Sequence, residues 1–167
     1  MCIYSLIISA INKLVMKEQE GQIISFLSFK LGKEVFATNV NITNKILQLP
    51  EITKVPHAHN DMVGIINHHG NVLPVFDLSG KLDSKQKDYQ KNTCVIILSG
   101  SEDNESSQFG LIVDEVLSVD EISESDILPP PNLGSSKKLS NIKGIFKKAE
   151  EFIMILNVEE IFKQINN

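Results

Sequence analysis

The feature that most constrains this chain is a series of short apolar runs separated by turn residues. Apolar runs joined by Gly, Asn, Lys or His residues predict β-hairpins. From residue 22 onward these runs are IISFLSFKL (23–31), EVFAT (34–38), MVGIIN (62–67), VLPVFDL (72–78), CVIILS (94–99), FGLIVDEVLSV (109–119), SNIKGIFK (140–147) and FIMIL (152–156). Their spacing is typical of all-β barrels or sandwiches.

Helical signals are few. Asn157 with Glu160 resembles a capping pair, and the apolar residues that follow share one helical face, which predicts a short C-terminal helix packed on the strands. Single helical turns are also expected over about 39–46 and after Asp77. The polar stretch 100–108 reads as a solvated hairpin tip, and the prolines at 129–131 as a stiff extended connector.

Residues 1–21 stand apart from this pattern. The apolar segment 1–15 has no basic residue before it and no cleavage site after it, and it is too short to span a bilayer. Its i, i+3/i+4 apolar spacing allows an amphipathic helix docked on the body or on a partner. The alternative, which we favour, is an extension without function that precedes a true start at Met16.

Charge and size exclude several classes of protein. The 167 residues are 42% hydrophobic and 22% charged, as in an ordinary globular chain. The net charge is −5, and all 16 basic residues are lysines. An acidic chain without arginine is poorly suited to nucleic acid or to an arginine-finger mechanism. The two cysteines, Cys2 and Cys94, have no paired spacing and are expected to be reduced structural thiols.

The histidines are the one candidate for catalysis. All four lie between residues 57 and 69, and His57-Ala-His59-Asn60-Asp61 matches the HxHxD pattern that resembles the first ligand cluster of metallo-β-lactamase hydrolases. Met62 stands where that pattern continues with histidine, and no downstream histidine ligands follow. Nucleophile-elbow, Walker and Rossmann motifs are also missing. We therefore expect no enzyme activity, no cofactor and no bound metal, and loop histidines rather than ligands.

A more specific signal lies in VGIINHHGNVLPVFDLSGKL (63–82), which resembles the signature of the CheW family, the adaptors of bacterial chemotaxis. The matching positions are Gly64, Ile66, Asn67, Gly70, Pro74, Val75, Asp77 and Leu78. The resemblance continues through 26–40 and 46–56 upstream and through 109–119, 127–134 and 142–146 downstream.

The resemblance implies a mainly β fold with two intertwined five-stranded SH3-like β-barrels, a hydrophobic groove between them and a short C-terminal helix. Residues 22–163 are expected to form this unit, with two barrel subdomains that meet near 78–92. Residues 1–21 would then be an extension and residues 164–167 a tail.

The family's function is implied as well: a non-catalytic cytoplasmic adaptor that couples methyl-accepting chemoreceptors to a CheA-type histidine kinase at the inner face of the membrane. The expected partners are the kinase's regulatory domain and the receptor's cytoplasmic signalling tip. The predicted kinase-facing residues are Thr43, Lys45, Ile46, Val63, Gly64, Ile66, Asn67, His69, Gly70 and Leu73. The predicted receptor contacts are Val95, Val113 and Val116.

Two alternatives to this interpretation stay open, and the chain departs from the family signature at two places. A CheW-like protein of another receptor–kinase pathway, such as surface motility, would have the same pattern. A small metal-dependent hydrolase would use His57, His59, Asp61 and His69. The chain departs from the family signature at His68-His69, where Leu-Arg is usual, and at Lys45, where Glu is usual. We predict that this loss of an Arg–carboxylate fork makes the chain a divergent family member with a retuned or weakened kinase or receptor preference.

Overall fold

The computed structural model describes residues 5–11, 21–79, 88–100, 107–130 and 141–166. Its strands fall in two groups, in agreement with the mainly β prediction. The strands are β1 (Ile23–Leu31), β2 (Glu34–Asn39), β3 (Thr43–Gln48), β4 (Met62–His68), β5 (Asn71–Phe76), β6 (Cys94–Ser99), β7 (Gln108–Val113), β8 (Glu115–Ser123), β9 (Ile142–Lys148) and β10 (Glu151–Leu156). Short 3₁₀ helices η1 (Val40–Ile42) and η2 (Glu124–Asp126) and the helix α2 (Val158–Asn166) complete this part of the chain.

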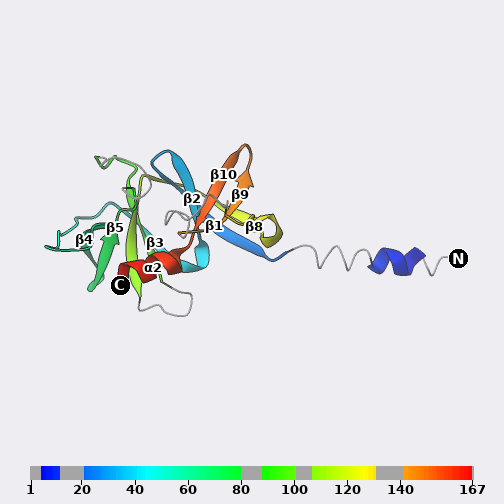
Figure 1. The fold of residues 1–167 in the computed structure, drawn as a ribbon, viewed down its shortest axis with the longest axis horizontal. Helices are drawn as coiled ribbons and strands as arrows, with labels where there is room; N and C mark the ends of the chain where they lie inside the picture. The colour runs from blue at the N-terminus through cyan, green and yellow to red at the C-terminus, as the bar shows by residue number, and fades with distance from the viewer. Residues whose placement is uncertain (1–4, 12–20, 80–87, 101–106, 131–140, 167) are drawn as a thin grey trace.

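The strands form two five-stranded sheets. One has the order β8-β1-β2-β10-β9 and is called barrel 1 here; the other has the order β3-β6-β7-β5-β4 and is called barrel 2. In Figure 1, β3, β4 and β5 lie at one end of the molecule and the strands of barrel 1 lie beyond them. The predicted fold of two five-stranded SH3-like barrels with a C-terminal helix is confirmed.

The barrels are intertwined because barrel 1 takes its strands from both ends of the sequence. The chain leaves barrel 1 at η1, completes β3–β7 as barrel 2, and returns at Asp114. The predicted boundary near 78–92 does not coincide with either crossing, since β5 and β6 on its two sides belong to the same sheet. Residues 80–87 within it lie outside the described part of the chain.

Asp114 fixes the return crossing. Its carboxylate accepts a hydrogen bond from the Gly32 amide at 2.8 Å, and its own amide donates to the Lys30 carbonyl at 2.9 Å. The run 109–119, predicted as one strand, is therefore two strands in different sheets. Gly32 occupies the β1–β2 turn with φ +65°, a conformation that favours glycine.

A shared core joins the barrels. One cluster of buried side chains includes Leu27, Phe29 and Phe36 of barrel 1 together with Phe76 and Phe109 of barrel 2. Each barrel also has a smaller cluster of its own. The largest cluster therefore belongs to both sheets, and the two barrels share one hydrophobic core.

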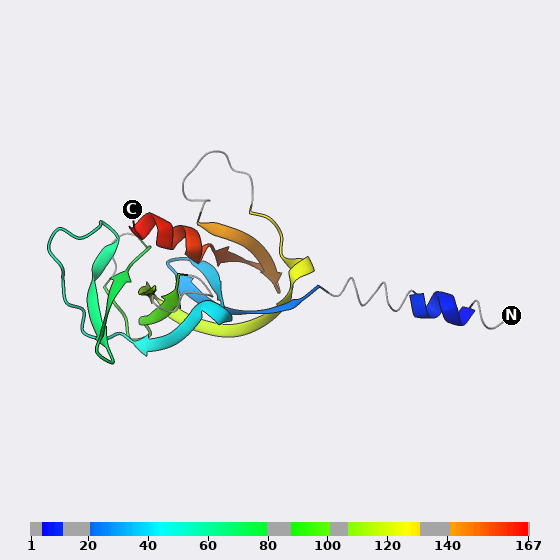
Figure 2. The same ribbon diagram turned by 90° about the horizontal axis from the view of Figure 1, so that it is seen from below.

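Helix α2 covers this junction, as Figure 2 shows. The Asn157 side chain accepts a hydrogen bond from the Glu160 amide at 3.2 Å, which confirms the predicted cap. Val158 and Ile161 are buried in the shared core, and the Phe162 ring stacks on Phe109 with centroids 5.9 Å apart. The helix continues to Asn166, so residues 164–166 belong to it rather than to a tail.

A polar network joins the two edge strands of barrel 1. Lys148 on β9 bonds the Asp120 carboxylate on β8 and donates to the Ser118 hydroxyl at 2.9 Å. The buried Ser28 hydroxyl lies within hydrogen-bond distance of Ser118 and Asp120. Burial would raise the pKa of Asp120, but the hydrogen bonds from Lys148, Ser118 and Ser28 and the charge of Lys148 hold it below its usual value. This network closes the barrel where strand pairing ends.

The N-terminal segment has a helix over residues 5–11, and every side chain in that helix is exposed. The helix therefore does not pack on the barrels, and in Figure 1 it lies well apart from them. Of the two sequence expectations, docking on the body is not observed. None of the helices in the described ranges is long and apolar enough to cross a membrane.

Candidate partner-binding surfaces

The β4–β5 hairpin builds one candidate surface. His69 and Gly70 are its two turn residues, with φ of +51° and +84°, the pattern of a type I′ turn. The Asn67 side chain accepts a hydrogen bond from the Gly70 amide at 3.0 Å and fixes this turn. The hairpin therefore holds the His69 side chain at an exposed tip.

The segment after β3 pairs with β4 and closes barrel 2. Thr53 and Ile65 exchange two backbone hydrogen bonds, each 2.9 Å long. A Cβ atom at Gly64 would lie 2.3 Å from the Thr53 carbonyl oxygen. Gly64 is buried, so its place in the family signature has a packing explanation: only a residue without a side chain admits this approach.

Lys45, His68 and His69 gather at one end of barrel 2, called the basic rim here. Leu47 and Ile66 pack in the core of that barrel, and alternation along β3 and β4 places Lys45 and His68 on the same side, nearer the end. The imidazole rings of His68 and His69 have centroids 4.3 Å apart. Partial burial and the charges of His69 and Lys45 lower the pKa of His68.

The predicted kinase-facing residues divide by exposure. Lys45, Ile46, Asn67, His69 and Gly70 are exposed, Val63 and Thr43 are half-buried, and Gly64, Ile66 and Leu73 are buried beneath them. The Thr43 hydroxyl donates to the Asn39 carbonyl at 3.0 Å, which ties it to the chain crossing instead. The sequence prediction left out His68, although two adjacent histidines at a hairpin turn were a visible signal.

The predicted receptor contacts need correction. Val95 and Val113 have no exposed surface: Val95 lies in the core of barrel 2, and Val113 lies in the shared core. Neither can contact a partner in this structure, and only the half-buried Val116 stays a prediction. The sequence prediction did not include Leu117 and Val119 on β8, which are exposed and alternate with the hydrogen-bonded Ser118 and Asp120. That alternation was readable from the sequence.

The histidine cluster does not form a metal centre. His59 Nδ1 lies 3.4 Å from an Asp61 carboxylate oxygen, while His57 is exposed with φ +58°. Within the ranges the structure describes, no three His, Cys, Asp or Glu side chains are placed to hold a metal ion. The hydrolase alternative, which needs His57, His59, Asp61 and His69 together, has no site there.

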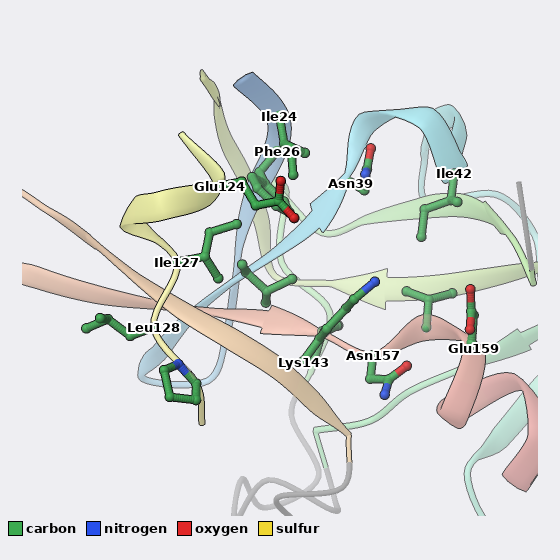
Figure 3. A pocket seen from close by; sticks show the side chains of 14 residues that line it. Ile24, Phe26, Asn39, Ile42, Glu124, Ile127, Leu128, Lys143, Asn157 and Glu159 are labelled. Atoms are coloured by element: carbon green, nitrogen blue, oxygen red, sulfur yellow. The ribbon is translucent and has the colours of Figure 1, made fainter. Parts of the chain in front are cut away.

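A cavity of about 730 Å³ lies in barrel 1 beside α2, as Figure 3 shows. Its lining mixes apolar residues such as Ile24 and Ile127 with Asn39, Lys143 and Glu159. The cavity shares no residue with the basic rim.

The architecture defines the class of the protein: a double-barrel β module with exposed apolar residues on both barrels. Comparison with known proteins then gives the family. The CheW-like domain profile matches residues 25–166, and the chain therefore belongs to the CheW-like domain family. This family consists of non-catalytic scaffold proteins, and the chain is a coupling protein of chemotaxis.

Individual relatives agree with this assignment. The chain is 27% identical to chemotaxis protein CheW of Rhizobium meliloti over 81% of this chain and 85% of that protein. It is 28% identical to chemotaxis protein CheW of Helicobacter pylori over 89% of this chain and 87% of that protein. The crystal structure of the scaffolding protein TtCheW from Thermoanaerobacter tengcongensis matches with a TM-score of 0.72 and 27% identity, over 81% and 90% of the two chains.

Proposed function

We propose that the chain couples the cytoplasmic signalling tip of a chemoreceptor to the regulatory domain of a CheA-type histidine kinase, and that it does so without catalysis, cofactor or metal. It would act in the cytoplasm, at receptor arrays on the inner face of the membrane. The observation that carries the proposal is the pair of separate exposed surfaces, one on each barrel, held by a shared core. A rigid link between two binding surfaces is what a coupling protein needs.

The kinase surface is assigned to the exposed part of barrel 2. Ile46 on β3 is 44% exposed and Val72 on β5 is 64% exposed, and both lie on the barrel that carries the basic rim. Exposed aliphatic groups next to charged ones match the usual composition of transient protein interfaces. The fixed β4–β5 turn supports the surface by limiting the entropy lost on binding.

The receptor surface is assigned to β8. Leu117 and Val119 project from an edge strand of barrel 1 whose intervening side chains, Ser118 and Asp120, are held by hydrogen bonds. The half-buried Val116 lies between this strip and the shared core. A helical receptor tip with aliphatic side chains is the kind of partner that such a strip fits.

The test measures binding of two purified partners, a receptor signalling-tip fragment and a kinase regulatory domain, by calorimetry. Leu117→Ser with Val119→Ser should weaken receptor binding about tenfold or more and leave kinase binding unchanged. Ile46→Asp should weaken kinase binding about tenfold or more and leave receptor binding unchanged. Phe152→Ser is the matched control, because Phe152 is 58% exposed on β10 of the same barrel as the receptor strip.

Equal loss of receptor binding in Phe152→Ser and in the β8 double variant would contradict the assignment of the receptor surface. Absence of a complex with either partner at tens of micromolar would contradict the coupling function itself.

A further inference from the structure

The basic rim combines three groups that can carry positive charge. Lys45 is exposed on β3, His68 ends β4, and His69 occupies the turn that follows. Among the ion pairs of the described residues, none joins a carboxylate to any of the three. The chain as a whole is acidic, with a net charge of −5, so this local excess of positive charge is unusual for it.

The charged groups that face His68 both lower its pKa. On β3 the facing charge is Lys45, and in the turn it is His69; both oppose a proton on His68. The paired strand β5 carries no ionisable side chain. In the segment 51–61 the ionisable residues are Glu51, Lys54, His57, His59 and Asp61, and the Asp61 carboxylate lies beside the His59 ring. The two charges that act on His68 in the described part of the chain both oppose its proton, and neither is a carboxylate.

We propose that the basic rim recognises a carboxylate-bearing surface on the kinase regulatory domain, and that the complex takes up protons at His68 as it forms. The inference rests on the proposed function and adds the chemistry of the partner. Partner carboxylates would offset the repulsion that His68 meets within the rim and favour its protonated form. The adaptor then binds its kinase more tightly as pH falls.

The experiment titrates the full chain with the kinase regulatory domain by calorimetry at pH 6.0 and 8.0. At pH 6.5 the titration is repeated in two buffers that differ in ionisation enthalpy, which gives the net proton uptake. The wild-type chain should bind about 3–10-fold more tightly at pH 6.0 than at pH 8.0, with net proton uptake. Lys45→Glu should weaken binding at both pH values more than Lys45→Gln does.

The variant that isolates the effect is His68→Gln with His69→Asn. Asn tolerates the positive φ of the turn, so the hairpin should keep its shape. This double variant should lose the proton uptake and also the part of the pH dependence of the kinase affinity that the two histidines cause. His59→Asn is the matched control, since His59 is an exposed histidine close in the sequence to the rim. This variant should leave the proton uptake and the pH dependence of the affinity unchanged.

Three results would overturn the inference: equal affinity at the two pH values, no proton uptake in the wild-type chain, or uptake that persists in the rim double variant. Each would leave the coupling function standing, provided that the complex forms. Failure of the wild-type chain to bind at either pH would instead contradict the proposed function, and the inference with it.

Discussion

Gly64→Ala tests how barrel 2 is closed. The added Cβ would lie 2.3 Å from the Thr53 carbonyl oxygen and 2.7 Å from Ile52 Cγ2, closer than the 3.0 Å that real Cβ contacts respect. The Thr53 backbone must therefore withdraw by at least 0.7 Å, which breaks its two hydrogen bonds to Ile65. Each such bond contributes about 1 kcal/mol, and partial exposure of Ile52 adds about another.

The free energy of unfolding should therefore fall by about 2–3 kcal/mol, with a drop in Tm of roughly 5–10 °C. Because the chain has no tryptophan, unfolding is best followed by far-UV circular dichroism in urea. Hydrogen exchange at the Ile65 amide gives a local readout and should accelerate in the variant. Gly70→Ala is the control: its Cβ meets open space, and only its φ of +84° costs about 1 kcal/mol. A loss for Gly64→Ala no larger than that for Gly70→Ala would refute the reasoning.

Further predictions concern the barrel-1 network, the helix cap and the buried thiol. Asp120→Asn should cost about 1 kcal/mol at pH 7, a value kept small because Lys148 is 45% exposed. Since the pKa of Asp120 is lowered on folding, the difference in unfolding free energy should shrink as pH falls below about 4; a constant difference would contradict this. Asn157→Ala should cost about 1 kcal/mol in urea unfolding, and Asn157→Asp much less, because the cap bond to Glu160 is kept. Burial raises the pKa of the Cys94 thiol and keeps reagents in the solvent away from it. In a Cys2→Ser chain, iodoacetamide should therefore react slowly until urea unfolds the protein, and equal rates would argue against burial.

Much of the fold could be predicted because local signals agreed with it. The β1–β2 and β4–β5 hairpins follow from apolar runs around glycine turns, and the C-terminal helix follows from its cap and apolar face. The helical turn predicted over 39–46 is present as η1 at 40–42, but residues 43–46 begin β3 instead; most of the side chains of β3 are exposed, so the period-two pattern of a strand is weak there. The crossing at Asp114 was missed because a carboxylate bond to Gly32, 82 residues away, determines it.

The candidate surfaces were predicted less completely. Sequence pattern identifies β4 and β5 but not which valines face a core, so Val95 and Val113 were assigned to a surface although both are fully buried. Burial depends on how two sheets share one core, which no local pattern encodes. The basic rim depends on the approach of β3 to β4, strands at opposite edges of the sheet order.

The central claim is that two separate surfaces bind two partners at the same time. The most direct measurement is the affinity of the receptor signalling-tip fragment for this chain, first alone and then with the chain saturated by the kinase regulatory domain. We expect a ternary complex in which the receptor affinity stays within about threefold of its value alone, because the β8 strip and the basic rim lie on different barrels. Displacement of the kinase domain by the receptor fragment would contradict it.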